Sequence, residues 1–281
     1  MNITFLKGGV LEAIDRGFIH IHPDVRPVPA RTGDIIIAEY GCTVSGRAVA
    51  HAAEQNISLF ITGAGAAKLY YWCPVERPWE KFAQQLVAAD TPHVQDAVAC
   101  WMVEQRFGEK INPIHGVAVA RGSEGASVRK IYKDMAQKYG IEWTGRKTTG
   151  RWRDQTPINR TLSLCNAALY GLTEIAILHA GYSPYFGFMH GRTGKGLVYD
   201  IADMVKFERI VPIAFAAVAD GRPHPEWRAR AACIRLFRRC GLLRELISIT
   251  ERTMEVAFES FSQKPPRRRW GYLPRHMAKN R

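Results

Sequence analysis

Residues 158–181, INRTLSLCNAALYGLTEIAILHAG, form the longest stretch with an apolar helical pattern. Its apolar side chains recur every three or four residues, at Leu162, Cys165, Leu169, Leu172 and Ile175. This spacing predicts one long helix, and Gly181 is the residue type that commonly ends a helix. The stretch is so apolar that we expect this helix at the centre of the core.

Other helical patterns surround this one. WEKFAQQLVAAD (79–90), HVQDAVACWMVEQRFG (93–108) and SEGASVRKIYKDMAQKYG (123–140) each place apolar residues at helical intervals. Two further helices are expected after Tyr199 and after Glu226. The main part of the chain is therefore predicted to be α-helical.

The first 75 residues have a strand pattern in place of a helical one. Short β-branched or aromatic runs at 3–6, 9–14, 17–22, 34–39, 57–62 and 68–72 alternate with Gly, Pro and Asp signals. One helix interrupts them at 45–56, with Ser45 as its N-cap. We predict an α+β protein: a β-rich domain at 1–75, a linker at 76–82, an α-helical domain at 83–263 and a basic tail at 264–281.

Composition excludes several classes of protein. Of 281 residues, 47% are hydrophobic and 23% charged, which is typical of a soluble globular protein. No apolar run approaches the roughly 18 residues of a membrane span, and the N-terminus lacks the order of a signal peptide. The six cysteines form no CxxC pair, so we expect reduced, mostly buried thiols in a cytoplasmic protein.

The net charge of +13 is unevenly distributed. Residues 1–80 carry about −1 and the remainder about +14. A concentrated basic surface favours a phosphate-rich polymer as partner over a merely soluble basic protein. Arg146 belongs to a basic cluster around Trp152 that suits DNA phosphates. A solvated face explains that cluster equally well.

Chemistry-bearing residues gather in GFMHGRTGKGLVYDIADMVKF (187–207). Asp200 and Asp203 lie one helical turn apart, and a glycine loop can bring His190 back to them. Glu124, between two glycines at an expected helix start, is the best further ligand. Such donors suit Mg²⁺ or Mn²⁺, although acidic residues in a first helical turn also merely complement the helix dipole. Arg192 and Lys195 would then meet phosphate oxygens.

Two glycine motifs are not nucleotide sites. GAGAAK (63–68) lies between two expected strands and predicts a hairpin turn. GRTGKG (191–196) has glycine where a phosphate loop requires Ser or Thr, so ATP hydrolysis is not indicated.

The combination of GSEG, GFMHG and YDIADMVKFE, with LCNAALYGLTEIAILHAGYSP before the histidine, resembles the CRISPR-associated integrase of spacer acquisition. The likeness covers nearly the whole chain, and details such as W…GR at 143–146 are most similar to subtype I-E members. It implies a β-sandwich-like N-terminal domain followed by a larger all-α catalytic domain.

The resemblance also implies site roles. Glu124, His190 and Asp203 match the metal ligands, Asp200 matches a neighbouring acid that supports catalysis, and Lys68 matches a DNA-contacting basic position. The family carries Mg²⁺ or Mn²⁺, forms homodimers, and two dimers flank one dimer of a smaller CRISPR-associated partner. Where some I-E members have an aromatic wedge, FLKGG offers Lys7, Gly8 and Gly9.

The implied reaction is metal-dependent transesterification: the 3′-hydroxyl of a short captured duplex attacks a phosphodiester at the edge of a CRISPR repeat, beside its leader. Two rivals stay open. One is a non-catalytic architectural DNA-binding protein, which explains the charge. The other is a metal-dependent hydrolase of small phosphorylated molecules, which predicts little salt dependence of duplex binding.

Overall fold

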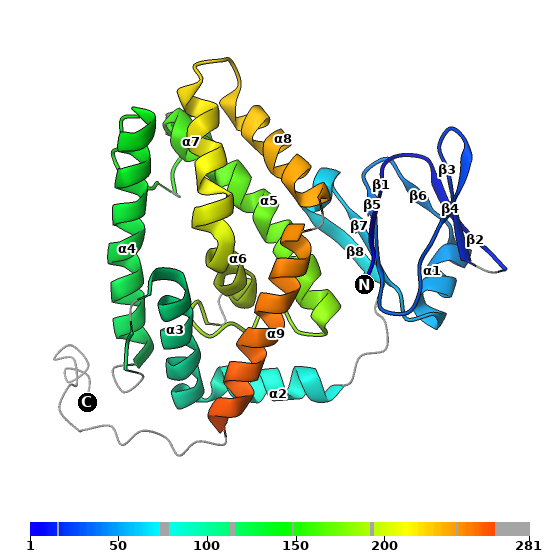
Figure 1. The fold of residues 1–281 in the computed structure, drawn as a ribbon, viewed down its shortest axis with the longest axis horizontal. Helices are drawn as coiled ribbons and strands as arrows, with labels where there is room; N and C mark the ends of the chain where they lie inside the picture. Colours follow the sequence, from blue (N-terminus) through cyan, green and yellow to red (C-terminus); the bar gives the residue numbers. More distant parts are fainter. Residues whose placement is uncertain are drawn as a thin grey trace.

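The protein consists of a strand-rich part and a helical part, as the computed structural model in Figure 1 shows. The structure describes residues 1–15, 17–73, 79–108, 110–112, 116–147, 149–191, 194–239 and 241–261. The predicted α+β class is confirmed, because the described chain begins with two sheets and continues as helices. The predicted tail at 264–281 lies outside the described residues.

The strand-rich part is a pair of four-stranded sheets. The first has the order β1 (Ile3–Leu6), β5 (Ile35–Glu39), β7 (Ser58–Thr62) and β8 (Leu69–Cys73); its first three strands are parallel and β8 is antiparallel. The second has the order β4 (Val25–Val28), β3 (Gly17–Ile21), β2 (Val10–Ile14) and β6 (Thr43–Val44). Helix α1 (Gly46–Glu54) begins as predicted, since the Ser45 hydroxyl accepts a 3.0 Å hydrogen bond from the Ala48 amide.

All six predicted strands are present, and two were missed. β4 contains Pro27, which breaks a strand pattern but is tolerated at a sheet edge. β6 has only two residues, too few for a pattern to show. The GAGAAK turn does join two antiparallel strands, β7 and β8, through a 3₁₀ turn, η1 (Ala64–Ala66).

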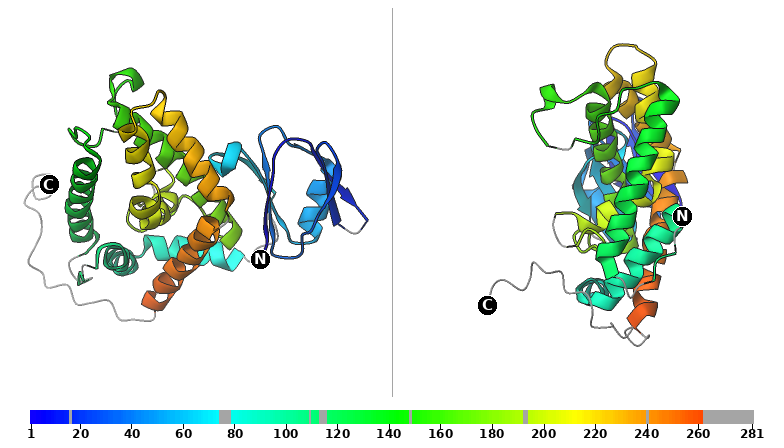
Figure 2. Two further views of the ribbon diagram at one scale, coloured as in Figure 1. Left: turned by 45° about the horizontal axis from the view of Figure 1, so that its top comes forward. Right: turned by 90° about the vertical axis from the view of Figure 1, so that its left-hand side faces the viewer.

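The first sheet contributes to two cores at once. Successive side chains of a strand point to opposite faces. Ile36 and Leu59 pack in the core between the sheets, whereas Ile35, Ile37 and Phe60 pack in the core of the helices. The molecule therefore has three layers: the second sheet, the first sheet and the helices, with the strands on one side of the helical part (Figure 2).

The helical part has eight α-helices within the described residues. They are α2 (Trp79–Asp90), α3 (Pro92–Phe107), α4 (Gly116–Tyr139), α5 (Pro157–Ala180), α6 (Gly196–Arg209), α7 (Val211–Ala219), α8 (Pro225–Arg238) and α9 (Gly241–Phe261), with a 3₁₀ turn, η3 (Trp152–Asp154), before α5. Helix α5 is the predicted central helix, and it ends at Gly181 in the left-handed conformation.

By length and composition α5 would pass for a membrane span, which the sequence reading overlooked. However, 72% of its most apolar stretch is buried inside the protein, so it is the core helix. Helix α2 spans Trp79–Asp90 as its pattern predicts, so its first turn lies inside the range predicted as linker. Helix α4 begins at Gly116 rather than near residue 123. The glycines that suggested a helix start are accommodated within α4.

Helices α5 and α8 hold the first sheet at close range. A β-carbon on Gly171 of α5 would lie 2.4 Å from the Ala67 backbone carbon, and one on Gly65 would meet Ile234 of α8 at the same distance. Arg238 of α8 donates two hydrogen bonds to Glu39 of β5, from Nε to Oε1 and from Nη2 to Oε2. These contacts fix the strand-rich part against the helices that carry the candidate site.

Candidate active site of histidine and carboxylates

Asp200 organises the loop before α6. Its side chain is fully buried and accepts four hydrogen bonds. Oδ2 receives the amides of Phe188 (2.6 Å) and Met189 (3.0 Å), and Oδ1 receives the amide (2.9 Å) and Nδ1 (2.7 Å) of His190. The predicted return of the loop to the aspartates is therefore confirmed. Asp200 lies in the second turn of α6, not at its start, because the helix begins at Gly196.

Two glycines make this closure possible. A β-carbon on Gly196 would lie 1.9 Å from the Gly191 carbonyl oxygen, and one on Gly187 would lie 2.7 Å from Asp200 Oδ2. Only a residue without a side chain fits at either position. The glycine loop is thus a close-packed support for His190, which differs from a loop arranged around a phosphate.

The orientation of His190 follows from that support. Because Nδ1 donates to Asp200, Nε2 is the ring nitrogen that a metal would have to use. The ring edge packs on Tyr199 at 5.7 Å between centroids. Burial lowers the pKa of His190, but the hydrogen bond and charge of Asp200, with the charges of Asp203 and Glu124, raise it overall above 6.5.

Glu124 and Asp203 meet across a buried arginine. Arg106, at the end of α3, donates from Nη1 to Glu124 Oε1, and its Nη2 lies 4.0 Å from Asp203 Oδ2. Lys206 binds Asp203 Oδ1 at 2.5 Å from the next turn of α6. All four side chains are largely buried, with 4% of Arg106 and 13% of Glu124 exposed. The two carboxylates are therefore separated by one guanidinium group.

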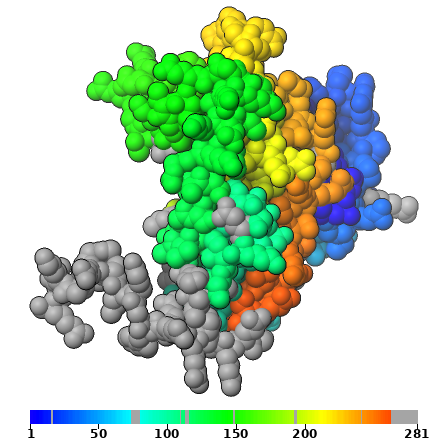
Figure 3. Space-filling view, turned by 60° about the vertical axis from the view of Figure 1, so that its left-hand side comes forward, coloured from blue at the N-terminus to red at the C-terminus, as the bar shows by residue number. Residues whose placement is uncertain are grey.

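The position of Glu124 differs from the expectation. It lies two turns inside α4 and not at a helix start, since α4 begins at Gly116. Helix α4 forms a ridge on one face of the molecule, shown in Figure 3. Its inner side points Glu124 at Arg106, while Arg121 binds the Met189 carbonyl next to His190 at 2.7 Å.

Of the four basic residues predicted to contact DNA, one is exposed, two are bound to other side chains, and one lies outside the described residues. Lys68 is exposed, with its ammonium 5.4 Å from the centre of the Tyr70 ring. Lys195 binds both oxygens of Glu174 on α5, at 2.7 and 2.6 Å. Arg146 donates to Asn159 and Ser163, which ties the loop after α4 to α5. Arg192 lies outside the described residues.

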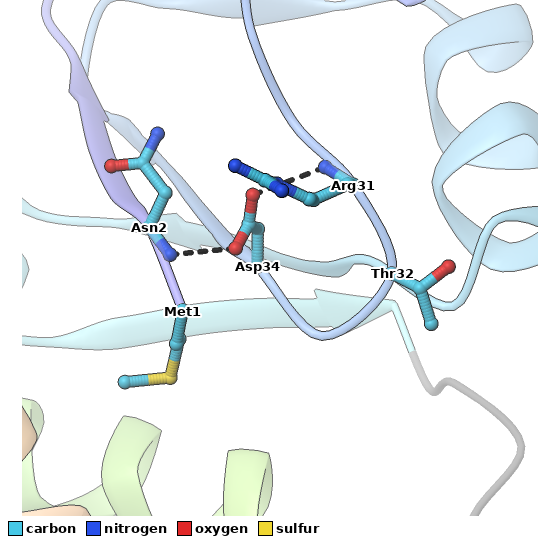
Figure 4. Close-up of a pocket in the computed structure, with 5 residues that line it drawn as sticks. All are labelled: Met1, Asn2, Arg31, Thr32 and Asp34. Carbon is cyan, nitrogen blue, oxygen red and sulfur yellow. Dashed lines mark hydrogen bonds between the residues drawn. The ribbon is translucent and has the colours of Figure 1, made fainter.

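Sequence reasoning missed Arg106, Lys206 and Arg121. Lys206 had a signal, because it follows Asp203 by three residues on one helix. Arg106 had none, since it reaches the carboxylates from another helix. A polar cavity of about 500 Å³ near the N-terminus, lined by Met1, Asn2, Arg31, Thr32 and Asp34, includes none of the predicted site residues (Figure 4).

The donor set suits a hard divalent cation. Two carboxylates and an imidazole are donors that Mg²⁺ and Mn²⁺ accept, and both carboxylates approach the same small cationic group. Among the described residues, no three His, Cys, Asp or Glu side chains form a ready metal-binding group. Arg106 binds one oxygen of Glu124, and Lys206 binds one oxygen of Asp203. A metal ion would fit in place of the Arg106 guanidinium, which lies between the two carboxylates.

Fold and site together define an α+β protein whose helical part holds a histidine beside buried carboxylates. The model of the family "CRISPR associated protein Cas1" matches residues 104–225, which include every residue of this cluster. The chain is 35% identical to CRISPR-associated endonuclease Cas1 3 of Methanospirillum hungatei JF-1 over 90% of this chain and 86% of the relative. It therefore belongs to the Cas1 family.

Two further comparisons agree. CRISPR-associated endonuclease Cas1 of Escherichia coli K12 is 35% identical over 89% of this chain and 84% of its own length. The crystal structure of a TtCas1–DNA complex superposes with a TM-score of 0.80 at 28% identity, covering 91% of this chain and 95% of that one. The three-layer fold is thus the fold of solved Cas1 proteins.

Proposed function

We propose that the protein is a divalent-metal-dependent DNA endonuclease and integrase that inserts short captured DNA, as spacers, into a CRISPR repeat array. One observation carries this proposal: Asp200 holds His190 within the segment that matches the family, and the charges of Asp203 and Glu124 act on that imidazole. Relatives at 35% identity are named CRISPR-associated endonucleases, and a relative of similar fold is bound to DNA.

Glu124, Asp203 and Nε2 of His190 are the groups that would hold Mg²⁺ or Mn²⁺. Bound there, the ion would polarise a phosphoryl oxygen and stabilise the leaving 3′-oxygen. Asp200 would fix the ring orientation and the Nδ1 proton of His190, as carboxylates do behind metal-binding histidines. Lys206 would hold the Asp203 carboxylate in position through its ion pair with Oδ1.

Strand transfer would exchange one phosphodiester bond for another. The 3′-hydroxyl of the captured duplex loses its proton as its oxygen forms a bond to phosphorus. The bond from phosphorus to the 3′-oxygen at the edge of the repeat breaks, and that oxygen takes up a proton. One phosphodiester replaces another, so the reaction needs no ATP. The buried ammonium of Lys206 near Asp203 would favour the negative charge that develops on the phosphoryl group.

The wider assembly is proposed from the family resemblance. Lys68, exposed on the strand-rich part, would contact duplex phosphates without reading bases. We propose a homodimer that joins a smaller CRISPR-associated partner, in the ratio of two dimers to one partner dimer, and a cytoplasmic location. From the motif details we also propose that the chain is most similar to subtype I-E members.

The test is an integration assay. Wild-type protein is incubated with a short duplex, a repeat-bearing plasmid, Mn²⁺ and the smaller partner; the expected product is a covalent half-site junction. Asp203→Asn should abolish that product and leave duplex affinity within a few-fold. A variant that still joins DNA as well as the wild type would refute the catalytic assignment and leave the architectural DNA-binding function.

The salt dependence of duplex binding tests the substrate. A DNA-processing protein should lose affinity steeply as salt rises, because phosphate contacts release counterions. An affinity that stays flat with salt would favour a hydrolase of small phosphorylated molecules.

A further inference from the structure

Arg106 stands out among the buried charges of the molecule. Its side chain is only 4% exposed, and Nη1 is bound to Glu124. Within the described part of the chain, Nε and Nη2 have no hydrogen-bond partner, and Nη2 lies 4.0 Å from Asp203 Oδ2. A buried guanidinium with most of its donors unpaired is costly, so a purely structural role accounts poorly for it.

Two aromatic rings give the guanidinium a second source of stabilisation. The Arg106 guanidinium carbon lies 4.7 Å from the centre of the Phe107 ring and 5.4 Å from that of Phe207. Rings attract a cation without forming directional hydrogen bonds. The charge therefore remains favourable over the rings when its bond to Glu124 is given up.

The charges around the carboxylates already balance. Arg106 and Lys206 carry two positive charges against the two negative charges of Glu124 and Asp203. A divalent cation bound to the same oxygens would add two positive charges at contact distance from Arg106. Like charges this close in a buried site repel strongly. Metal and guanidinium are therefore alternatives for the same carboxylates.

We propose that Arg106 is a positioning residue that occupies the carboxylates of Glu124 and Asp203 in the metal-free protein and competes with the metal for them. It keeps two acidic side chains together before an ion arrives and lowers the affinity for the ion alone. This inference rests on the metal site of the proposed function.

The test measures Mn²⁺ binding by the metal-free protein, by calorimetric titration without DNA. Arg106→Met keeps an apolar stem between the two phenylalanine rings and removes the charge. It should bind Mn²⁺ about tenfold more tightly than the wild type, a size typical of coupling between two sites. The metal-free variant should melt at a lower temperature than wild type, and saturating Mn²⁺ should raise its melting temperature by more.

Two further variants sharpen the result. Arg129→Met removes a charge from the exposed side of α4 and should leave the Mn²⁺ affinity unchanged. Arg106→Lys keeps the charge but has no planar fork to span two carboxylates, so its affinity should lie between wild type and Arg106→Met. If Arg106→Met fails to fold, the lysine variant decides the question.

Different outcomes would refute the competition by Arg106 and the metal site itself. Equal or weaker Mn²⁺ binding by the Arg106 variants, with clear binding by wild type, would refute the competition and leave the metal site standing. An equal gain in Arg129→Met would also refute it, since the effect would then be one of net charge. Absence of Mn²⁺ binding in every variant would refute the metal site itself.

Discussion

Replacing Asp200 with asparagine removes the support of His190 while keeping the shape of the side chain. Asp200 accepts two hydrogen bonds on each oxygen. Asparagine has one acceptor oxygen, so either orientation loses two bonds and sets an NH₂ group against N–H donors. Each hydrogen bond to a charged group contributes about 1.5–3 kcal/mol, which gives a loss of about 3–6 kcal/mol.

Urea unfolding measures that loss. It is a large part of the about 5–15 kcal/mol that holds a typical domain together. Strand transfer should fall about 10- to 100-fold, the usual effect of removing the partner of a metal-binding histidine. Asp34→Asn is the matched control, because Asp34 is also buried and accepts two backbone amides, from Asn2 and Arg31 (Figure 4). It should lose stability and keep the transfer rate per folded molecule.

The pKa of His190 provides a second, independent measure of the effect of Asp200→Asn. In the wild type the folded-state pKa is raised above 6.5, so this residue adds stability that is complete below pH 6.5 and lost as pH rises through the raised value. In the variant, burial becomes the main influence, so the pKa measured by NMR should fall below 6.5 and the sign of the pH dependence should reverse.

Either of two results would contradict this role of Asp200. Stability of Asp200→Asn within about 0.5 kcal/mol of wild type would mean that the four hydrogen bonds contribute little, as at an ordinary surface site. An unchanged pKa of His190 would mean that Asp200 does not hold the ring in solution.

Three further changes test other parts of the structure. Gly196→Ala should prevent loop closure and abolish the half-site product, since its β-carbon would lie 1.9 Å from a backbone oxygen. A β-carbon on Gly122 of α4 meets nothing within 4 Å, so Gly122→Ala should raise stability by about 0.5–1 kcal/mol in urea unfolding. Lys68→Ala should weaken duplex binding and reduce the slope of log affinity against log salt concentration by about one. Lys195→Ala should have a smaller effect, because the Lys195 ammonium is bound to a carboxylate on α5. Fluorescence anisotropy at several salt concentrations would compare the two variants, and a larger effect of Lys195→Ala would contradict this prediction. Glu39→Gln should cost about 1–3 kcal/mol in thermal unfolding, because its half-buried arginine partner loses a charged acceptor; a neutral effect would argue against a fixed sheet.

Much of the fold was predictable because it depends on local patterns. The β-branched and aromatic runs at residues 34–39 and 57–62 indicate strands, and the spacing along 158–181 indicates a core helix, whatever else surrounds them. The return of His190 to Asp200 was predictable too, since the loop between them is short and rich in glycine.

The site itself was predictable only in part. Glu124 was expected at a helix start because two glycines flank it, but contacts with neighbouring helices carry α4 through them. The approach of Arg106 depends on how α3 packs against α4 and α6, and no spacing within the sequence encodes that. Which of several basic residues have charged partners, as Lys195 does, likewise depends on tertiary packing.

The sharing of the first sheet between two cores bears on how the chain folds. Cutting the chain after residue 73 would expose Ile3, Ile35, Ile37 and Phe60 to water on one face of that sheet. It would also leave Ser58 without the buried imidazole of His179, 2.9 Å away. The strand-rich part is therefore an incomplete folding unit. Calorimetric melting of the whole protein should give a single cooperative transition, in which strands and helices are lost together.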